Sequence, residues 1–329
     1  MEGDGNMILA GDIGGTHTRL AFVTVNGKRL QVVAETTYPS REHANIETVL
    51  GQFISSHSFS VEQACFGVAG PIKHGRCEAT NLPWVVDSRL LATQLNIQDV
   101  GLINDLEANA YGIAALEKED FTVLNEGAAD AEGNQAIISA GTGLGEAGLY
   151  WNGHHHRAFA SEGGHTDFAP RNALEIDLLR YLLSRFQRVS YERVLSGPGL
   201  LNIYEFFRDT RRAEEPAWLS EKMQRSDPSA VIAQEALEDR SPLCAQALQL
   251  FVSLYGSEAG NLALKVLATG GLFVGGGIAP KIIQKLKDST FLESFTSKGR
   301  MKPLLEAITV RVILNEKTAL LGAARCATL

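Results

Sequence analysis

The segment ILAGDIGGTHTRLAFVTVNGKRL, residues 8–30, has the pattern of a β-hairpin that opens an α/β domain. An apolar run leads into a glycine-rich turn, then a second strand with alternating apolar residues, then an Asn26-Gly27 pair that favours a tight hairpin. The segment AIISAGTGLGEAGLYWNGHHHRA, residues 136–158, repeats this order. Two such hairpins in one chain predict that the protein contains two related halves.

The rest of the chain alternates strand and helix patterns. Short apolar runs predict buried strands at 64–69, 100–103, 271–277 and 308–314. Helical periodicity predicts helices at 45–57, 87–95, 105–117, 173–186, 198–209, 228–238, 242–268, 279–288 and 316–327. The polar segment 211–228 is expected to be a surface connection. This alternation predicts the α/β fold class with partly parallel sheets.

Length and composition indicate an ordinary globular protein. The chain has 329 residues, 45% of them hydrophobic and 21% charged, which is enough for two domains. A formal net charge of −8 disfavours nucleic-acid and anionic-membrane partners, which attract clustered Lys and Arg. The start of the sequence, MEGDGNMILAGDIGG, has no basic segment followed by a long apolar run, so we expect a cytoplasmic protein without a membrane anchor.

Residue types that often bind metals are present but scattered. The four cysteines lack the paired spacing of a zinc site, and no disulfide framework is expected from Cys65, Cys77, Cys244 and Cys326. The run His154–His156 follows the turn residues Asn152 and Gly153. We expect this run to be an exposed loop, and we assign it no function.

Three glycine-rich turns follow apolar strands, at residues 11–19, 139–148 and 274–281. Glycine lets the backbone approach an anion closely, so such turns either cradle phosphate or simply form tight hairpins. The first two turns occupy matching positions, with Gly141 at the place of Gly14 and Gly145 at that of Thr18. None has the sequence of a Walker A loop or leads into the helix of a dinucleotide-binding fingerprint. Together the three turns favour a nucleotide ligand.

Asp12 lies in the first of these turns. A carboxylate beside phosphate-binding amides is expected to hold a divalent cation, directly or through water. The alternative is an aspartate that only stabilises the turn through its own backbone.

The segment LINDLEANA, residues 102–110, runs from a strand directly into a helix. Asn104 and Glu107 have the spacing of a capping box. Asp105 is therefore either a catalytic carboxylate or a first-turn residue that the helix dipole stabilises.

A further group of polar residues could bind a polyhydroxyl ligand, because carboxylate and imidazole groups accept hydrogen bonds from sugar hydroxyls. The group consists of Asn104, Asp105, Glu162, His165 and Glu192. Taken singly, His165 could be a structural histidine, and Glu192 an ordinary surface carboxylate.

These motifs, taken together, resemble one protein family over nearly the whole chain, from about residue 8 to 325. In order they are GDIGGTHTRLAF, GVAGPI, TNLPW, INDLEANA, SAGTGLGEAG, SEGGHTDFAP, ERVLSGPGL and GGLFVGGGIAP. The set looks like the bacterial ATP-dependent glucokinases of the hexokinase and actin-like ATPase superfamily.

The resemblance implies a two-domain actin-like ATPase fold, a duplicated ribonuclease H-like core with ATP and glucose in the cleft between the domains. The small domain would comprise residues 1–109 and 315–329, and the large domain residues 110–314. A homodimer is what the family suggests.

The resemblance also implies roles for individual residues. Asp105 would be the general base, and the sugar ligands would be Asn81, Asn104, Asp105, Glu162, His165 and Glu192, with the Gly70-Pro71 turn shaping the same pocket. The ATP-binding residues would be Gly11, Asp12, Ile13, Gly14, Gly15, Thr16, Gly141, Thr142, Gly143, Gly275, Gly276 and Gly277. Asp12 would hold Mg²⁺ through water.

The sequence departs from the family pattern at two positions. His17 stands where relatives often have Asn, and Glu146 stands where a small or apolar residue is common. We expect Glu146 to face away from the phosphates. The clustered cysteine motif of the related zinc-containing sugar kinases is lacking, and no helix-turn-helix domain precedes Met7, so the zinc-free branch is favoured.

The implied reaction is transfer of the γ-phosphate of ATP to the 6-hydroxyl of glucose. A kinase for another hexose or for an amino sugar is the nearest alternative, since acceptor residues alone do not reveal hydroxyl stereochemistry. A non-enzymatic sugar sensor would be expected to lack the base or to carry a DNA-binding extension. An actin-like assembly ATPase would hydrolyse ATP without sugar.

Overall fold

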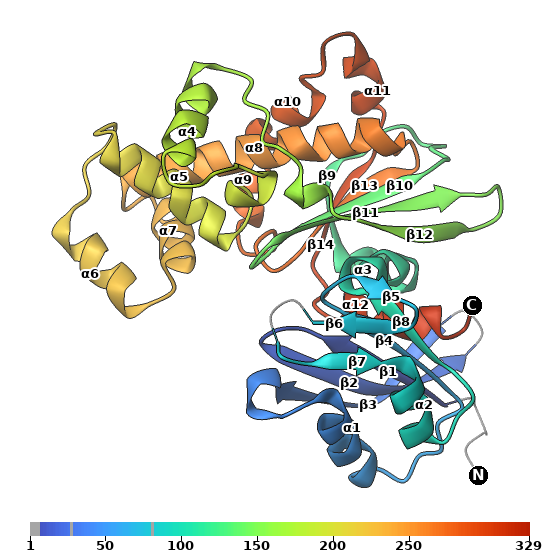
Figure 1. Ribbon diagram of the computed structural model, residues 1–329. Coiled ribbons are helices and arrows are strands. Elements are labelled where there is room, and N and C mark those ends of the chain that lie inside the picture. Colours follow the sequence, from blue (N-terminus) through green and yellow to red (C-terminus); the bar gives the residue numbers. More distant parts are fainter. Residues whose placement is uncertain (1–6, 27–28, 80–81) are drawn as a thin grey trace. The chain divides into compact units, whose positions relative to one another are not determined.

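The computed structural model describes residues 7–26, 29–79 and 82–329, which form two compact units (Figure 1). The first unit contains the described residues up to Asp120 together with Arg157–Ala160 and Asn315–Leu329. The second unit contains Phe121–His156 and Ser161–Leu314. The predicted domain boundary after residue 109 falls inside helix α3 (Asp105–Gly112), whereas the first unit continues to Asp120. The assignment of a small and a large functional domain stays a prediction.

The first unit is built on a five-stranded sheet of order β3-β2-β1-β4-β8. Its strands are β1 (Met7–Ile13), β2 (His17–Asn26), β3 (Arg29–Pro39), β4 (Gln63–Val68) and β8 (Val100–Asn104). Strands β1, β2 and β3 pair antiparallel, while β4 is parallel to both β1 and β8. The strands predicted from the alternation pattern are therefore confirmed. Gly27 of the predicted hairpin turn lies outside the described residues.

Period-two alternation along β1 and β2 gives this sheet two apolar faces. Leu9 and Phe22 belong to one core cluster, in which Phe22 stacks on Phe53 with ring centroids 4.8 Å apart. Ile8 and Val23 belong to a second cluster. The helices of this unit are α1 (Ile46–Ser55), α2 (Ser88–Leu95), α3 and α12 (Thr318–Cys326). A small sheet contains β5 (Ile72–Lys73), β6 (Arg76–Glu78) and β7 (Val85–Asp87).

Helices α3 and α12 pack with almost no space between their backbones (Figure 1). A Cβ atom added to Gly322 of α12 would collide with the carbonyl oxygen of Ala108 in α3. A Cβ atom added to Gly112 of α3 would collide with the carbonyl oxygen of Thr318. Small residues at these crossing points therefore hold α3, and Asp105 at its start, against the C-terminal helix.

The second unit is built on a six-stranded sheet of order β12-β11-β10-β13-β14-β9. Its strands are β9 (Phe121–Asn125), β10 (Gln135–Ala140), β11 (Leu144–Trp151), β12 (His156–Ser161), β13 (Gly271–Gly275) and β14 (Val310–Ile313). The antiparallel pair β10-β11 followed by parallel β13 and β14 repeats the order of the first sheet, which confirms the two related halves. Strand β9 was not predicted.

The two hairpin turns differ in length. Ile13 pairs with Thr18 in the first hairpin, whereas Ala140 pairs with Leu144 in the second. The second turn is thus one residue shorter, and Leu144 takes the place of Thr18. The predicted equivalence of Gly145 and Thr18 is wrong for this reason.

Helices make up most of the remainder of the second unit. They are α4 (Ala173–Leu183), α5 (Gly197–Asp209), α6 (Ala217–Arg225), α7 (Pro228–Leu237), α8 (Pro242–Val266), α9 (Ile283–Leu286), α10 (Ser289–Thr296) and α11 (Lys302–Glu306). Short 3₁₀ helices occur in both units. The first unit contains η1 (Ser40–Glu42), η2 (Ile113–Ala115) and η3 (Lys118–Asp120), and the second contains η4 (Gly163–His165), η5 (Tyr191–Arg193) and η6 (Gly299–Met301). No helix in the described part of the chain is long and apolar enough to cross a membrane.

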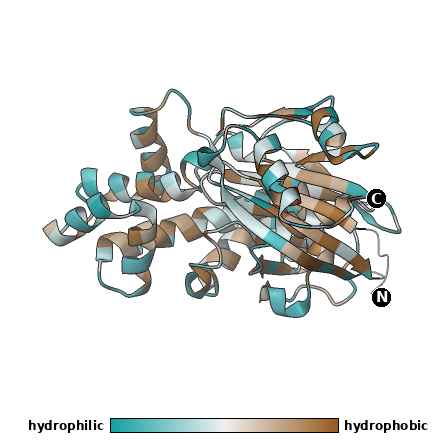
Figure 2. Cartoon of the chain, turned by 90° about the horizontal axis from the view of Figure 1, so that it is seen from below, coloured by the Kyte–Doolittle hydropathy of each residue, from teal (hydrophilic) through white to brown (hydrophobic). Residues whose placement is uncertain are grey.

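One element contradicts the sequence analysis. Segment 211–228 was expected to be a surface connection, but it contains helix α6, and Leu219 on that helix is fully buried. The helix is amphipathic but polar overall, and Leu219 is its one buried residue, so the sequence read as a polar connection. Figure 2 shows that many helices carry both hydrophilic and hydrophobic residues along their length.

Candidate active site

The first unit gathers its polar candidates at one edge of its sheet. Strands β1, β4 and β8 run parallel, with Ile13 paired to Val68 and Val68 paired to Asn104. Their carboxyl ends therefore lie side by side, and this edge is where open α/β sheets bind ligands. The turn after β1 and the start of α3 both begin at this edge.

The turn after β1 is anchored by hydroxyl groups. The N–H of Gly14 donates to the carbonyl of His17 at 3.0 Å, and the hydroxyl of Ser40 donates to the carbonyl of Gly14 at 2.8 Å. Thr16 and His17 are exposed at the tip. Gly11 and Ile13 are buried in β1, and a Cβ atom on Gly11 would collide with the ring of Phe66. These two residues therefore support the turn from inside the sheet.

Asp12 lies opposite Arg19 on the neighbouring strand. Burial raises the pKa of this carboxyl group above its ordinary value, and the positive charge of Arg19 acts in the opposite direction. Among the described residues no group of three His, Cys, Asp or Glu side chains could form a metal cage. One carboxylate is nevertheless adequate for Mg²⁺, which keeps several waters and binds phosphate oxygens.

Asn104 and Asp105 form the junction between β8 and α3. The amide oxygen of Asn104 accepts the N–H of Leu106 at 2.9 Å, and its amide nitrogen donates to the carbonyl of Gly70 at 3.2 Å. Burial raises the pKa of Glu107, and the nearby backbone N–H of Asn104 opposes that rise. The carboxyl group of Glu107 thus lies on the side of Asn104 where a capping box places it. In a capping box the side chain of Asn104 would accept the N–H of Glu107. Here it accepts the N–H of Leu106, one residue earlier.

Asp105 occupies the first turn of α3 and is partly exposed. One of its carboxylate oxygens accepts the N–H of Leu106 at 3.0 Å, and its own carbonyl accepts the side-chain amide of Asn109 at 3.0 Å. The side chain is thus oriented locally, by the helix start itself.

The second unit brings three of the predicted sugar-binding residues together. His165 Nδ1 lies 3.9 Å from Glu192 Oε1, and His165 Nε2 lies 3.9 Å from Glu162 Oε2. These separations are too long for hydrogen bonds. The side chains are 57%, 32% and 70% exposed for His165, Glu192 and Glu162. The cluster thus presents acceptors that hydroxyl groups of a ligand can reach.

Glu192 connects this cluster to the second glycine turn. Its Oε2 atom accepts the N–H of Leu144 at 3.0 Å. A Cβ atom added to Gly143 would lie only 2.6 Å from the same oxygen. Glycine at 143 therefore lets the phosphate-loop candidate and the sugar-binding candidate approach each other. The contact with Leu144 was missed from the sequence, where nothing links residues so far apart.

The third glycine turn also packs against the second. The N–H of Ile278 donates to the carbonyl of Ala140 at 3.2 Å. Gly276 has φ of +82°, and a Cβ atom there would collide with the same Ala140 carbonyl. Gly141, Thr142 and Gly143 thus lie close to Gly275, Gly276 and Gly277, as expected if both turns contact one nucleotide.

The start of helix α5 is a further part of this site that was not predicted. The N–H of Gly197 donates to the carbonyl of Gly141 at 2.8 Å, and Ser196 caps the helix by accepting the N–H of Gly199 at 3.0 Å. A helix N-terminus carries partial positive charge that favours phosphate. The Ser-Gly-Pro-Gly sequence, with an N-cap residue followed by proline, was the available signal.

Two predicted features lie apart from these turns, and Asn81 is outside the described residues. Glu146 faces away from the exposed turn, as expected: it is buried in β11, and its carboxyl group lies against Gly163 and Glu258. His154 and His155 form the expected exposed loop, in which both backbone N–H groups donate to the side chain of Asn152. The prediction is wrong for His156, which is half-buried at the start of β12, with its ring nitrogen 3.0 Å from the carbonyl oxygen of Gly133.

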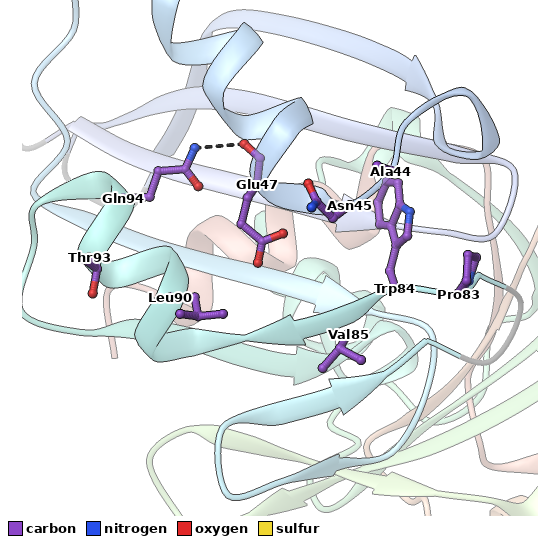
Figure 3. A pocket seen from close by; sticks show the side chains of 9 residues that line it. All are labelled: Ala44, Asn45, Glu47, Pro83, Trp84, Val85, Leu90, Thr93 and Gln94. Atoms are coloured by element: carbon purple, nitrogen blue, oxygen red, sulfur yellow. Dashed lines mark hydrogen bonds between the residues drawn. The ribbon is translucent and has the colours of Figure 1, made fainter.

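A hollow of about 600 Å³ on the first unit contains none of the predicted site residues. It lies between the start of α1 and the length of α2, and its lining includes Glu47, Trp84, Leu90 and Gln94 (Figure 3). The side-chain amide of Gln94 donates to the carbonyl of Glu47 across it at 2.8 Å. This hollow is therefore separate from the candidate site.

Comparison with known proteins gives consistent matches over the full chain. The family model Glucokinase matches residues 9–329. The glucokinase of Nostoc sp. is 46% identical, over 98% of each sequence. The crystal structure of a glucokinase from an Antarctic psychrotroph is 31% identical with a TM-score of 0.86, covering 98% of this chain and 99% of that one. A ROK-family glucokinase from Streptomyces griseus, crystallised with glucose and AMPPNP, shares the fold at 20% identity, with a TM-score of 0.67 and coverage of 98% and 99%.

Proposed function

The chain belongs to the glucokinase family, and from this premise we propose how its residues serve the reaction. It is an ATP-dependent hexose kinase with the two-domain actin-like ATPase fold. It transfers the γ-phosphate of ATP to the 6-hydroxyl of glucose, giving glucose 6-phosphate and ADP.

Glu162, His165 and Glu192 bind the sugar hydroxyls in this proposal. The observation that supports this assignment is the convergence of the three side chains. The ring nitrogens of His165 lie 3.9 Å from a carboxylate oxygen of Glu162 and of Glu192, too far for hydrogen bonds. Glu192 Oε2 is already bonded to the N–H of Leu144, but Glu192 Oε1 and the exposed side chains of Glu162 and His165 can receive hydroxyl protons from a polyol. Asn81 and Asn104 are assigned to the same glucose by the family motifs.

Asp105 is the general base. Its carboxylate receives the proton of the 6-hydroxyl as that oxygen bonds to phosphorus. The N–H of Leu106 holds the acceptor in place. A carboxylate is only a weak base, but the attacking hydroxyl becomes strongly acidic late in the transfer, so orientation matters more than a raised pKa.

The glycine turns bind ATP. Gly14, Gly15 and Thr16 of the first unit, and residues 141–143 of the second, present backbone N–H groups to the phosphates. Residues 275–277 serve the adenosine, and the α5 N-terminus adds positive potential beside Gly141. The AMPPNP and glucose present in the Streptomyces griseus relative support this pairing of ligands.

Asp12 holds the Mg²⁺ that accompanies ATP, a cation that supplies charge neutralisation for the phosphates. Replacing Asp12 by Asn is expected to raise the Mg²⁺ concentration for half-maximal rate roughly 10-fold, the scale found when a carboxylate that orients a metal's ligands is lost. The measurement is ADP release against total Mg²⁺ at fixed ATP.

Asp87→Asn is the matched control for Asp12→Asn. Asp87 caps α2 in the same unit, and Asn caps helices equally well. This control is expected to keep the Mg²⁺ dependence of the unaltered protein. An unchanged Mg²⁺ requirement in Asp12→Asn would contradict the metal assignment.

Sugar selectivity is tested by ADP release with a panel of hexoses at fixed Mg·ATP. Glucose is expected to have the highest kcat/KM, and release without sugar should be slow. A higher kcat/KM with an amino sugar or another hexose would favour the alternative kinase. Sugar-independent hydrolysis accompanied by sedimenting filaments would favour an assembly ATPase.

Two finer assignments complete the proposal. The enzyme works in the cytoplasm, where its co-substrate ATP is made and used. It forms a homodimer, as the family pattern suggests, and analytical ultracentrifugation would detect the dimer as a species of twice the chain mass. A monomer at all concentrations would contradict that assignment.

A further inference from the structure

Two buried carboxyl groups face each other beneath the sugar-binding cluster. Glu146 on β11 and Glu258 on α8 have almost no exposed surface and are hydrogen-bonded to each other. Glu258 also accepts the amide of Asn261 at 2.7 Å and the ammonium of Lys265 at 3.0 Å. Among the described residues the Oε1 atom of Glu146 has no hydrogen-bond partner.

These contacts assign the protons of the pair. Glu258 accepts hydrogen bonds from Asn261 and Lys265, so the proton that the two carboxyl groups share is placed on Glu146. Burial, followed by the negative charge of Glu258, raises the pKa of Glu146 to about 8, while Lys265 acts in the opposite direction. At neutral pH Glu146 is the protonated member and donates its proton to Glu258.

The pair supports both segments that carry the sugar-binding residues. The carboxyl group of Glu146 occupies the space where a Cβ atom of Gly163 would lie, and Gly163 stands between Glu162 and His165. The side-chain amide of Asn261 donates both to Glu258 at 2.7 Å and to the hydroxyl of Tyr191 at 3.0 Å, and Tyr191 directly precedes Glu192.

The two segments are also tied to each other. The backbone N–H of Tyr191 donates to the carbonyl of Thr166 at 3.0 Å, and the hydroxyl of Tyr191 accepts the amide of Asn261 at 3.0 Å. A change in the spacing of Glu146 and Glu258 would therefore reach residues 162–166 and 191–192 together.

We propose that the Glu146–Glu258 pair, sharing one proton, is a positioning element that fixes Glu162, His165 and Glu192 for glucose binding. This inference rests on the proposed sugar site. It assigns a role to Glu146, where the family more often has a small or apolar residue. Neither glutamate touches the reacting atoms in this proposal.

The pair makes glucose binding sensitive to pH. Because the pKa of Glu146 is raised in the folded chain, its contribution to stability is fully present below the unfolded value of 4.5 and is lost as pH rises through about 8. Ionised Glu146 and Glu258 repel each other and loosen both segments. The glucose KM should then rise several-fold above about pH 8, with little change in kcat.

Other titratable groups face the pair and must be distinguished from it. They are Lys265, Lys298, Tyr191 and Tyr255, with Arg171 and Glu175 beyond Lys298. Lys298 is the main competitor, because burial and the nearby Arg171 lower its pKa to about 8 while it donates to Asn261 at 2.7 Å. Only a substitution at Glu146 separates the two groups.

The test is the glucose KM of Glu146→Gln, measured from about pH 6 to about pH 9.5 at saturating Mg·ATP. The carboxamide keeps a donor toward Glu258 but cannot ionise. We expect a KM within about twofold of the unaltered protein at neutral pH and no rise above about pH 8. The same alkaline rise in Glu146→Gln would overturn the inference and leave Lys298 as its source.

Two further variants are needed to interpret the result: one is a control, and the other tests the proposed sugar site. Glu235→Gln is the matched control, since Glu235 is also fully buried and has an oxygen without a partner, but it bonds Lys222 of α6. It should keep the pH profile of the unaltered protein. Glu192→Gln tests the premise: an unchanged glucose KM there means that the proposed sugar site fails. If the glucose KM is raised in Glu192→Gln, while Glu146→Gln shows the same alkaline rise of KM as the unaltered protein, the sugar site stands and only the positioning role is excluded.

Discussion

Replacing Asp105 by Asn is expected to lower kcat by about 10²- to 10⁴-fold, the usual contribution of a positioned general base. Asn keeps the side-chain oxygen that accepts the N–H of Leu106, so α3 should begin as before. It cannot receive the proton of the 6-hydroxyl. Glucose affinity, measured by equilibrium titration, should therefore stay within a few-fold of the unaltered protein.

Glu107→Gln is the control for this substitution. Glu107 lies in the same helical turn, with its carboxyl group near the backbone N–H of Asn104, which is the position of a capping residue. Its amide counterpart keeps an acceptor for that N–H, so kcat should change little. A kcat near that of the unaltered protein in Asp105→Asn, or equal losses in the two variants, would exclude Asp105 as the base.

Replacing Gly322 by Ala is expected to cost at least about 3 kcal/mol of unfolding free energy, at the upper end for overpacked sites. The added methyl group would collide with the carbonyl oxygen of Ala108, a backbone atom that cannot rotate away. Helices α3 and α12 must then separate, which moves Asp105 and lowers kcat as well. Denaturant unfolding followed by circular dichroism measures the stability loss.

Gly51→Ala provides the comparison. Gly51 lies within α1, and a Cβ atom there has only an ordinary contact, 3.4 Å from the side-chain amide of Gln94. Alanine is the better helix former by roughly 1 kcal/mol, so this variant should be neutral or more stable. If Gly322→Ala were as stable as Gly51→Ala, the close packing of α3 and α12 would be disproved.

The elements that the sequence predicted well are those with strong local patterns. The hairpins β1-β2 and β10-β11 were predictable because apolar alternation and glycine turns occur within a few residues of each other. The start of α3 was predictable from Asn104 and Glu107 for the same reason. Helix α6 was missed because only Leu219 anchors it.

Contacts between distant residues were beyond the reach of pattern analysis. The hydrogen bond from Leu144 to Glu192, and the approach of Gly197 to Gly141, depend on how α5 and η5 fold back onto the sheet. Glu146 was recognised as unusual, yet its pairing with Glu258 required the packing of a strand against a helix. Turn length was equally hidden, so Gly145 was aligned one residue out of register.

The role of Asp105 in phosphoryl transfer, as opposed to glucose binding, is tested by a single-turnover experiment. Enzyme in excess over labelled ATP, saturated with glucose and Mg²⁺, is quenched on the millisecond scale, and glucose 6-phosphate is counted. For Asp105→Asn the transfer rate constant should fall at least about 100-fold, with the ATP still fully convertible at long times. A transfer rate constant equal to that of the unaltered protein, with only product release or glucose affinity changed, would contradict the assignment of Asp105 as the base.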